Sequence, residues 1–339
     1  MIMKPKDFIS PMQVSIEDEL QKQVARINLP DTSELYSMLT YHMGWTGDLC
    51  GTEAQGKRLR PLLLLLTTSA CGEDWEKALP AAASVELIHN FSLIHDDIQD
   101  NSQLRRGRPA VWIKWGMPQA INAGDSLLIL ANMAMNSCKT NFSHGKLYQA
   151  RDCLLSACLQ LTRGQFLDIS FEKRQRINLE EYWEMVGGKT ASLFQACCEI
   201  GAVIGTSKSQ MQESLSSFGR YLGLVFQVQD DILGIWGETE ITGKATGSDL
   251  FSKKKTLPVV YALQKKGEFA KLWDREQMAE QDVPTMAELL VKEGALLYAQ
   301  EIMDGLTDQA KMALRTANPQ GPASDLLYEI LQRAADRKA

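Results

Sequence analysis

The segment Glu86–Gly107 reads ELIHNFSLIHDDIQDNSQLRRG, and the interpretation of the chain starts from it. Its apolar residues recur at helical spacing up to three aspartates, Asp96, Asp97 and Asp100. Residues four apart share a helix face, so the first and third aspartates point the same way. His89 lies seven residues before Asp96 on nearly the same stripe. The segment predicts an apolar helix that ends in a carboxylate-bearing face.

Helical spacing of apolar residues continues along almost the whole chain, and the alternation typical of strands is scarce. The sequence therefore predicts an all-α protein. We expect helices at 14–27, 31–43, 57–71, 77–100, 117–137, 145–170, 179–186, 188–205, 209–236, 254–265, 285–293, 295–317 and 322–336. Breaker-rich stretches are short and no fixed repeat occurs, which favours one large helical bundle around a central cavity lined by inward-facing polar groups.

Composition and charge exclude several classes of protein. The chain has 339 residues, 45% hydrophobic and 23% charged, which is the balance of a globular protein with a sizeable core. Its net charge of −6 gives no indication of nucleic-acid binding. We expect no secretory signal and no transmembrane segment, because no apolar run approaches the ~20 residues that span a bilayer. Seven irregularly spaced cysteines without a CxxC motif indicate reduced thiols in a cytoplasmic protein and no zinc site.

The aspartates of the first acidic motif indicate a metal site. Three carboxylates at the end of an apolar helix repel one another unless cations bind. Oxygen ligands of this kind suit Mg²⁺, which keeps waters and bridges to substrate phosphates. The alternative is an acidic helix end exposed to solvent. Arg105 and Arg106 follow at once and favour the metal site, since carboxylates holding a metal beside arginines holding phosphate form a complete diphosphate site.

A second acidic motif lies in the segment QVQDDILGIWGE, residues 227–238. Gln227, Asp230 and Asp231 share one helical face within an otherwise apolar stretch, and a core helix rarely tolerates such a stripe without partners. The stripe alone is compatible with a buried hydrogen-bonded network. Together with the first motif it predicts two acidic walls that clamp the same metal-bound diphosphate.

Basic residues are spread over several short motifs. They are Lys57, Arg58 and Arg60 in GKRLRP, Lys189 in GGKT, Lys244 in TGK, and Lys253, Lys254 and Lys255 before TLP. Each alone is most often a solvated surface charge, but their proximity to glycines and helix beginnings favours anion binding. None matches the GxxxxGK[ST] phosphate loop, so nucleotide hydrolysis has no support.

Occurring together in this order, these motifs resemble the trans-isoprenyl diphosphate synthases, all-α enzymes that join isopentenyl diphosphate to an allylic diphosphate. The similarity covers about 30–339. We therefore expect 1–30 to form an N-terminal extension with the first helix and 31–339 to form the synthase domain. The resemblance also implies a homodimer, since family members usually form one.

The resemblance assigns roles to individual residues. Asp96 and Asp100 would hold Mg²⁺ ions that bridge the allylic diphosphate, Asp97 would support them, and Asp230 would add a ligand from the second motif. We expect the catalytic set to be Asp96, Asp97, Asp100, Asp230, Asp231, Lys189 and Lys244. The allylic diphosphate would be surrounded by Arg105, Lys189, Thr190, Gln227, Lys244 and Lys254. Isopentenyl diphosphate would be bound by Lys57, Arg58, Arg60, His89 and Arg106.

The chemistry of the family fits these residue types. Metals and cations withdraw charge from the leaving diphosphate, so that the C–O bond ionises to an allylic cation. The double bond of isopentenyl diphosphate then attacks, and the released diphosphate is the expected acceptor of the proton that is lost. No nucleophilic Ser, Cys or His is needed.

Two positions depart from the family pattern. Gly234 stands where the second motif often has a third aspartate, and Lys253 replaces a usual glycine before the lysine. The first departure weakens one metal position, and we expect a loop to tolerate the second.

Product length is predicted from the residues below the first motif. Phe91 lies five residues before Asp96, about 7.5 Å deeper along the helix. An aromatic residue there blocks a long chain, and Ser92 beside it is small. This pattern resembles geranylgeranyl diphosphate synthases, with farnesyl diphosphate synthases next. The alternative is that Phe91 only packs in the core and another helix sets the limit.

Two other functions remain open at this stage. A class I terpene cyclase shares the fold and the DDxxD motif, but it has no need of GKRLRP and His89, and Gly234 lacks the hydroxyl ligand of the cyclase motif. A non-catalytic subunit of a heteromeric synthase would generally have lost an aspartate motif or the basic residues. Here both are present.

Overall fold

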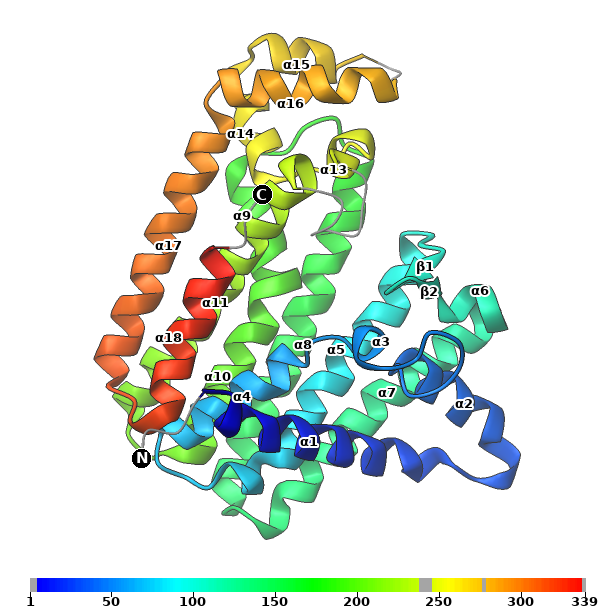
Figure 1. Ribbon diagram of the computed structural model, residues 1–339, viewed down its shortest axis with the longest axis vertical. Helices are drawn as coiled ribbons and strands as arrows, with labels where there is room; N and C mark the ends of the chain where they lie inside the picture. The colour runs from blue at the N-terminus through cyan, green and yellow to red at the C-terminus, as the bar shows by residue number, and fades with distance from the viewer. Residues whose placement is uncertain (1–4, 238–245, 276–278, 337–339) are drawn as a thin grey trace. The chain divides into compact units, whose positions relative to one another are not determined.

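The computed structural model describes residues 5–237, 246–275 and 279–336. These residues are almost entirely helical (Figure 1), which confirms the all-α prediction. The chain forms two compact units. The first consists of Met1–Leu155, Ala196–Glu213 and Pro319–Leu327, and the second of Ser156–Gln195, Ser214–Asn318 and Tyr328–Ala339. The division into an extension and a synthase domain at residue 30 stays a prediction.

The first unit begins with seven of its helices and one strand pair. In chain order they are α1 (Pro5–Val24), α2 (Ser33–His42), α3 (Thr52–Gln55), α4 (Leu59–Ala70), α5 (Leu79–Gln99), β1 (Leu104–Arg105), β2 (Arg108–Pro109), α6 (Val111–Trp115) and α7 (Met117–Ser137). Four further helices supply residues to both units: α8 (His144–Glu172), α10 (Ser192–Gly205), α11 (Ser209–Trp236) and α18 (Gly321–Ala335).

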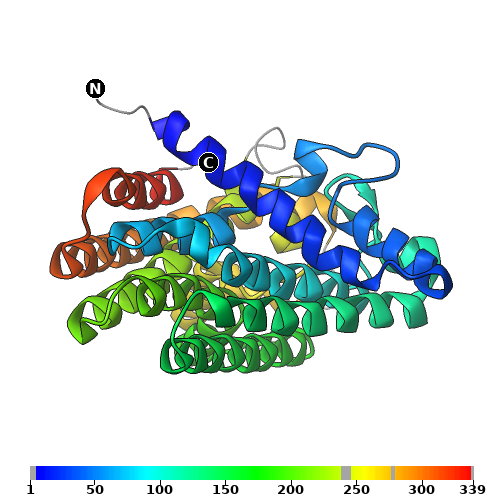
Figure 2. The same cartoon turned by 90° about the horizontal axis from the view of Figure 1, so that it is seen from below.

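Helices α5 and α7 pack closely and run in opposite directions. Ser84 Oγ near the start of α5 donates to Ala131 O near the end of α7, at 2.7 Å. At the other end, His95 lies so close to Gly124 that a Cβ there would stand 2.3 Å from His95 Nε2. Figure 2 shows α1 lying across the cyan helix α5. Helix α7 therefore lies against α5 from its beginning to its acidic end.

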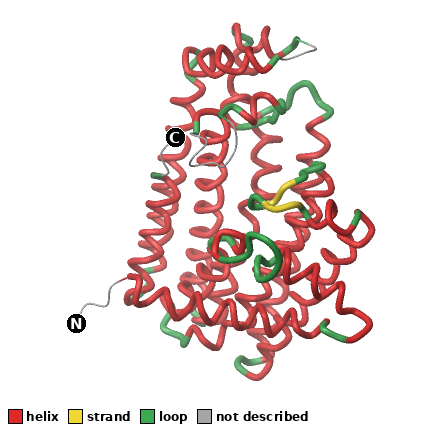
Figure 3. The backbone as a smooth tube through the Cα atoms, turned by 45° about the vertical axis from the view of Figure 1, so that its right-hand side comes forward, coloured by secondary structure: helices red, strands yellow, loops and turns green. Residues whose placement is uncertain are grey.

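A short hairpin follows the acidic end of α5 and was not predicted from the sequence. Leu104 pairs with Pro109 and Arg105 with Arg108, and Figure 3 shows these strands in yellow. The two turn residues, Arg106 and Gly107, have φ angles of 53° and 73°. Positive φ at both central positions is the requirement of a type I′ turn, whose twist matches the strands. The hairpin sends the two neighbouring arginines in different directions.

The second unit is also helical. It contains parts of the shared helices together with α9 (Leu179–Val186), the π-helical turn η5 (Gly187–Ala191), α13 (Ser248–Phe251), α14 (Leu257–Lys265), α15 (Glu268–Trp273), α16 (Val283–Lys292) and α17 (Ala295–Ala317). One core cluster joins α9, α11, α14 and α17 through buried Tyr182, Val228, Leu257 and Ala299. This core supports the second acidic motif on α11.

The cysteines and the helix lengths bear on two expectations from the sequence. All seven cysteines are free thiols. Within residues 5–237, 246–275 and 279–336, no helix combines the length and the apolar character needed to cross a bilayer.

Candidate active site

The end of α5 separates its three aspartates by exposure. The Asp100 amide donates to Asp96 O at 2.9 Å, so the last helical turn persists and the two carboxylates stay one turn apart. Asp100 is exposed and Asp96 partly so, whereas Asp97 is only 2% exposed. The helix thus presents the two predicted metal ligands and buries the residue predicted to support them.

Arg105 neutralises the buried aspartate. Its Nε donates to Asp97 Oδ1 at 2.9 Å and to Oδ2 at 3.2 Å, and its Nη2 is also bonded to Oδ1. Burial raises the pKa of Asp97, and the guanidinium opposes that rise. Arg105 Nη2 also lies 3.7 Å from Asp96 Oδ2. The hairpin therefore places a fixed positive charge against the acidic helix end.

His89 pairs with Arg60. Arg60 Nη1 lies 3.2 Å from His89 Nε2, and because a guanidinium can only donate, Nε2 must accept and the ring proton must be on Nδ1. Burial lowers the pKa of His89 well below its usual value, and Arg60 lowers it further. The His89 imidazole is therefore neutral and carries its proton on Nδ1.

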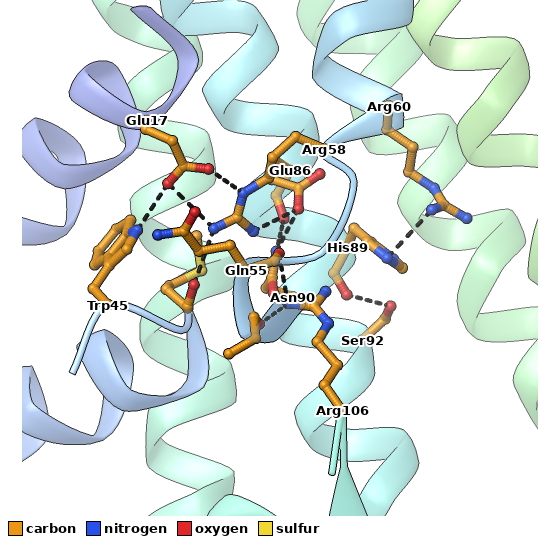
Figure 4. Close-up of polar contacts among 12 residues, drawn as sticks. Glu17, Trp45, Gln55, Arg58, Arg60, Glu86, His89, Asn90, Ser92 and Arg106 are labelled. Carbon is orange, nitrogen blue, oxygen red and sulfur yellow. Dashed lines mark hydrogen bonds and ion pairs between the residues drawn. The ribbon is translucent and has the colours of Figure 1, made fainter. Parts of the chain in front are cut away.

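Two other predicted ligands of isopentenyl diphosphate bind protein acceptors. Arg58 is buried and bonded to Glu17, Glu86 and a backbone carbonyl, so the geometry does not favour the direct contact with substrate that we expected (Figure 4). Arg106 Nη1 donates to the carbonyls of residues 54 and 55 at 2.7 Å each. Lys57 is exposed.

In the second unit, Lys189 lies on the π-helical turn η5. Its Nζ is 2.5 Å from Asp168 Oδ2 on α8. The two segments approach closely at Gly164, where a Cβ would stand 2.1 Å from the Lys189 amide nitrogen. Single π-helical turns are frequent at functional sites. The turn lies where we expected a break between the helices 179–186 and 188–205, so the chain stays helical there.

Thr190, Gln227 and Asp231 form a chain of hydrogen bonds. Thr190 Oγ1 donates to Gln227 Oε1 at 2.6 Å, and Gln227 Nε2 donates to Asp231 Oδ1 at 2.8 Å. Asp231 Oδ2 accepts from Tyr182 Oη at 2.6 Å and from the Leu257 amide at 2.8 Å. Burial raises the pKa of Asp231 to about 6. These bonds make Asp231 a residue that orients Gln227.

The remaining members of the second motif are more exposed. Asp230 is exposed beside buried Asp231, so each motif presents its first aspartate and buries its second. Lys254 Nζ lies 3.9 Å from Asp249 Oδ2, and the carboxylates around it, Asp249 first, raise the pKa of Lys254 against the effect of burial. Lys244 lies outside the described residues.

Gly234 and Lys253, the two departures from the family pattern, are each explained by their surroundings in the structure. A Cβ on Gly234 would stand 2.1 Å from Asp249 Oδ2, so the space beside this glycine is filled by a carboxylate from α13. Lys253 has a φ of 53°, the left-handed conformation that glycine adopts most easily. Its Nζ donates to Trp273 O at 3.3 Å and to Arg275 O at 2.8 Å. The loop accepts a lysine there, with backbone strain.

The carboxylates at the end of α5 are donors of the kind that Mg²⁺ prefers. Among the residues that the structure describes, no three His, Cys, Asp or Glu side chains are grouped to hold a metal by themselves. Mg²⁺ does not require such a group, because it usually takes one or two carboxylates, substrate phosphates and waters. The one-turn spacing of Asp96 and Asp100 at the exposed helix end fits that mode.

The residues predicted to limit product length lie on α5. Phe91 is partly buried and makes an edge-to-face contact with His95, their ring centroids 4.9 Å apart. Ser92 Oγ donates to His89 O at 2.8 Å. Phe91 thus has a defined neighbour one turn along the helix.

Several residues of these clusters were missed by sequence reasoning. They are Glu17, Glu86, Asp168 and Tyr182. Glu86 and Asp168 interrupt apolar helical stretches, and that interruption is a signal that could have singled them out. Glu17 and Tyr182 carry no comparable signal, because their partners Arg58 and Asp231 are remote in sequence.

Comparison with known proteins agrees with this geometry. Residues 50–290 match the family model of polyprenyl synthetases. The chain is 37% identical to a (2E,6E)-farnesyl diphosphate synthase of Mycobacterium bovis, covering 89% of this chain and 86% of that one. It is 34% identical to a geranylgeranyl diphosphate synthase of Methanosarcina mazei, covering 96% and 99%. A polyprenyl synthetase structure from Streptomyces coelicolor superposes with a TM-score of 0.88 at 32% identity, covering 98% and 99%.

The all-helical fold, the paired acidic motifs and the arginine hairpin define the class of enzymes that transfer prenyl groups between diphosphates. The chain belongs to the polyprenyl synthetase family. This confirms the resemblance found from the sequence motifs.

Proposed function

We propose that the protein condenses isopentenyl diphosphate with an allylic diphosphate and that its main product is geranylgeranyl diphosphate, with farnesyl diphosphate second. The observation that carries the proposal is the end of α5, where Asp96 and Asp100 lie one turn apart at the surface while Arg105 binds buried Asp97. A solvated acidic helix end would not need a buried aspartate with a dedicated arginine.

The roles of the site residues follow from the family resemblance and from their chemistry. Asp96, Asp100 and Asp230 would hold Mg²⁺, which when bound draws negative charge from the leaving diphosphate. Lys189 and Lys254 would add fixed positive charge to the allylic diphosphate. Each ammonium group lies beside a carboxylate, that of Lys189 beside Asp168 and that of Lys254 beside Asp249.

Isopentenyl diphosphate would bind to Lys57, Arg60, His89 and Arg106. Arg60 keeps the His89 ring in one tautomer, so the imidazole can donate a hydrogen bond without adding charge. The described site residues include no group that is evidently placed as a base. The proton lost after C–C bond formation would therefore pass to the released diphosphate.

Product length is a further part of the proposal. Phe91 lies below the first motif and would end the space available to the growing chain. Phe91→Ala should shift the main product to a longer chain. Ser92→Ala, which changes little volume one residue away, should leave the product length unchanged.

We also propose a homodimer that acts in the cytoplasm. Helix α7 carries exposed apolar residues at intervals of four or eight, namely Met117, Ile121, Ile129 and Met133. A stripe of exposed apolar side chains along one helix is typical of a protein–protein interface. Free cysteines are typical of a reducing compartment. Light scattering coupled to size exclusion would measure the mass in solution, and a monomer at micromolar concentration would contradict the dimer.

The deciding experiment incubates purified protein with Mg²⁺, isopentenyl diphosphate and, separately, dimethylallyl, geranyl or farnesyl diphosphate, and identifies the alcohols after phosphatase treatment. Geranylgeraniol as the main product would support the whole proposal, and farnesol would support the reaction but correct the length. A hydrocarbon released from one prenyl diphosphate alone would favour the terpene cyclase instead. No product with any substrate would favour the non-catalytic subunit.

A further inference from the structure

Arg58 and Arg60 stand two residues apart but have different partners (Figure 4). Arg60 reaches His89, whereas the Arg58 side chain is only 5% exposed and is surrounded by carboxylates and a carbonyl. The inference drawn from this difference rests on the proposed function. The residues around Arg58 would determine the positions of the side chains that bind isopentenyl diphosphate.

The Arg58 guanidinium makes four hydrogen bonds to protein acceptors. Nε donates to Glu17 Oε1 at 2.6 Å and Nη2 to Glu17 Oε2 at 3.4 Å. Nη1 donates to Glu86 Oε1 at 3.0 Å, and Nη2 also donates to Met43 O at 3.0 Å. A buried guanidinium is costly without such partners, and removing one of them leaves uncompensated charge. The cluster links α1, α5 and the segment after α2.

Arg58 also has a strained backbone. Its φ and ψ angles are 45° and 37°, in the left-handed region, at the residue that precedes α4. A residue with a side chain is disfavoured there relative to glycine. The side-chain network offsets this cost. It therefore fixes the turn from which Lys57 departs on one side and the first turn of α4, with Arg60, on the other.

The same carboxylates are connected to a second predicted ligand. Glu17 Oε2 accepts from Trp45 Nε1 at 2.8 Å, so α1 holds the beginning of the segment 43–56. The end of that segment is bonded to Arg106, whose guanidinium lies against Gly56 so closely that a Cβ there would stand 2.9 Å from Arg106 Cζ. Arg58 and Arg106 thus hold the segment at its two ends.

The charges of this region are balanced across the cluster. Burial first, and then the charge of Arg58, lower the pKa of Arg106 to about 10, while Glu86 and Glu17 oppose this shift. The two carboxylates therefore favour the charged form of a predicted substrate ligand. This electrostatic effect would be lost if either were replaced by a neutral residue.

We propose that Glu17 and Glu86 are positioning residues of the isopentenyl diphosphate site and act through Arg58. They fix the turn that presents Lys57 and Arg60, and through the segment 43–56 they orient Arg106. Helix α1 is then a working part of the site, although the family match begins only at residue 50. Arg58 supports the substrate ligands and does not touch substrate.

The test is a kinetic comparison of Glu17→Gln with wild type, varying one substrate while the other is saturating. Removing one partner of a buried charged hydrogen bond should raise KM for isopentenyl diphosphate about tenfold. KM for the allylic diphosphate and kcat should stay within about twofold, because Glu17 bonds Arg58 and Trp45, and neither is assigned to that substrate. Glu17→Asp, which keeps the charge, should restore part of the affinity.

Glu19→Gln is the matched control. Glu19 is another glutamate of the same helix, its side chain 9% exposed against 21% for Glu17, but it accepts hydrogen bonds from Gln23 and Lys22. Its replacement should leave both KM values unchanged. Trp45→Phe is a milder variant that keeps both carboxylates, and it should raise KM for isopentenyl diphosphate about threefold, the effect of one lost hydrogen bond. This variant decides the matter if Glu17→Gln does not fold.

The two proposals fail in different ways. A folded Glu17→Gln or Trp45→Phe variant with an unchanged KM for isopentenyl diphosphate would overturn this inference, as would equal increases in both KM values. Wild-type protein that consumes no isopentenyl diphosphate would overturn the proposed function itself. In a double-mutant cycle, Glu17→Gln combined with Arg58→Gln should raise KM no more than the larger single effect.

Discussion

Gly164→Ala tests whether the close approach of α8 to the π-helical turn determines the position of Lys189. The added Cβ would stand 2.1 Å from the Lys189 amide nitrogen and 2.6 Å from the Gly188 carbonyl carbon. Both are backbone atoms, so no side-chain rotation can relieve the contact. To reach an ordinary contact of about 3.4 Å, the turn must move by about 1.3 Å.

The magnitude has two opposing contributions. Overpacking a well-filled contact costs about 1–3 kcal/mol. Replacing a helical glycine by alanine returns about 0.5–1 kcal/mol. We therefore expect the free energy of unfolding to fall by about 1–2 kcal/mol. The effect on turnover should be larger, because a misplacement of about 1 Å at a catalytic group can reduce the rate about 100-fold.

The assay is urea unfolding together with kcat for elongation at saturating substrates. Gly145→Ala provides a matched control on the same helix, because a Cβ there meets nothing within 4 Å: it should leave kcat unchanged and should not lower the free energy of unfolding, which should rise by no more than the helical gain of about 0.5–1 kcal/mol. A Gly164→Ala protein with wild-type stability and wild-type kcat would refute the reasoning. Lost stability with normal kcat would show that the turn adapts without moving Lys189.

Three further predictions concern pH, the second motif and the metal. Burial lowers the pKa of His42 and His89 in the folded protein below the usual 6.5, so the unfolded chain binds protons first as the pH falls. The free energy of unfolding should therefore keep its full value above pH 6.5 and fall by about 1.4 kcal/mol per histidine by pH 5.5. Urea unfolding at both pH values measures this loss, which His42→Gln should reduce; equal stability at both would contradict it. Gly234→Asp should impair activity, since its side chain and Asp249 compete for one space, and Asp249→Ala should rescue it. If the double variant were no more active than Gly234→Asp alone, the two side chains would not compete for this space. Asp96→Asn should abolish most Mg²⁺-dependent turnover and weaken Mn²⁺ binding measured by calorimetry, and unchanged binding would remove it from the metal site.

Much of the fold could be predicted because helical periodicity is a local property. The expected range 117–137 matches α7, and 209–236 matches α11. The hairpin at Leu104–Pro109 was missed because two-residue strands have no periodicity to detect. The first helix begins at Pro5 and not at residue 14, since Met12 packs in the core and the chain stays helical through Pro11.

The candidate site was less predictable than the fold. Exposure follows from helix geometry, so the outward position of Asp96 and Asp230 could have been expected from the apolar residues around them. The residues that pair with the buried charged side chains could not be predicted in this way. Arg58 and Arg60 look alike in the sequence, and only the left-handed turn and the carboxylate of Glu17 from another helix give them different environments.

Lys253 shows how a departure from a family pattern can be retained. The left-handed backbone costs about 1–2 kcal/mol relative to glycine, and two hydrogen bonds of its ammonium group return about as much. Because these two contributions nearly cancel, lysine and glycine at this position should give the protein about the same stability. The lysine would then be kept or lost for another reason: it adds a positive charge next to Lys254, which would speed the capture of polyanionic substrates at low ionic strength and matter less in concentrated salt.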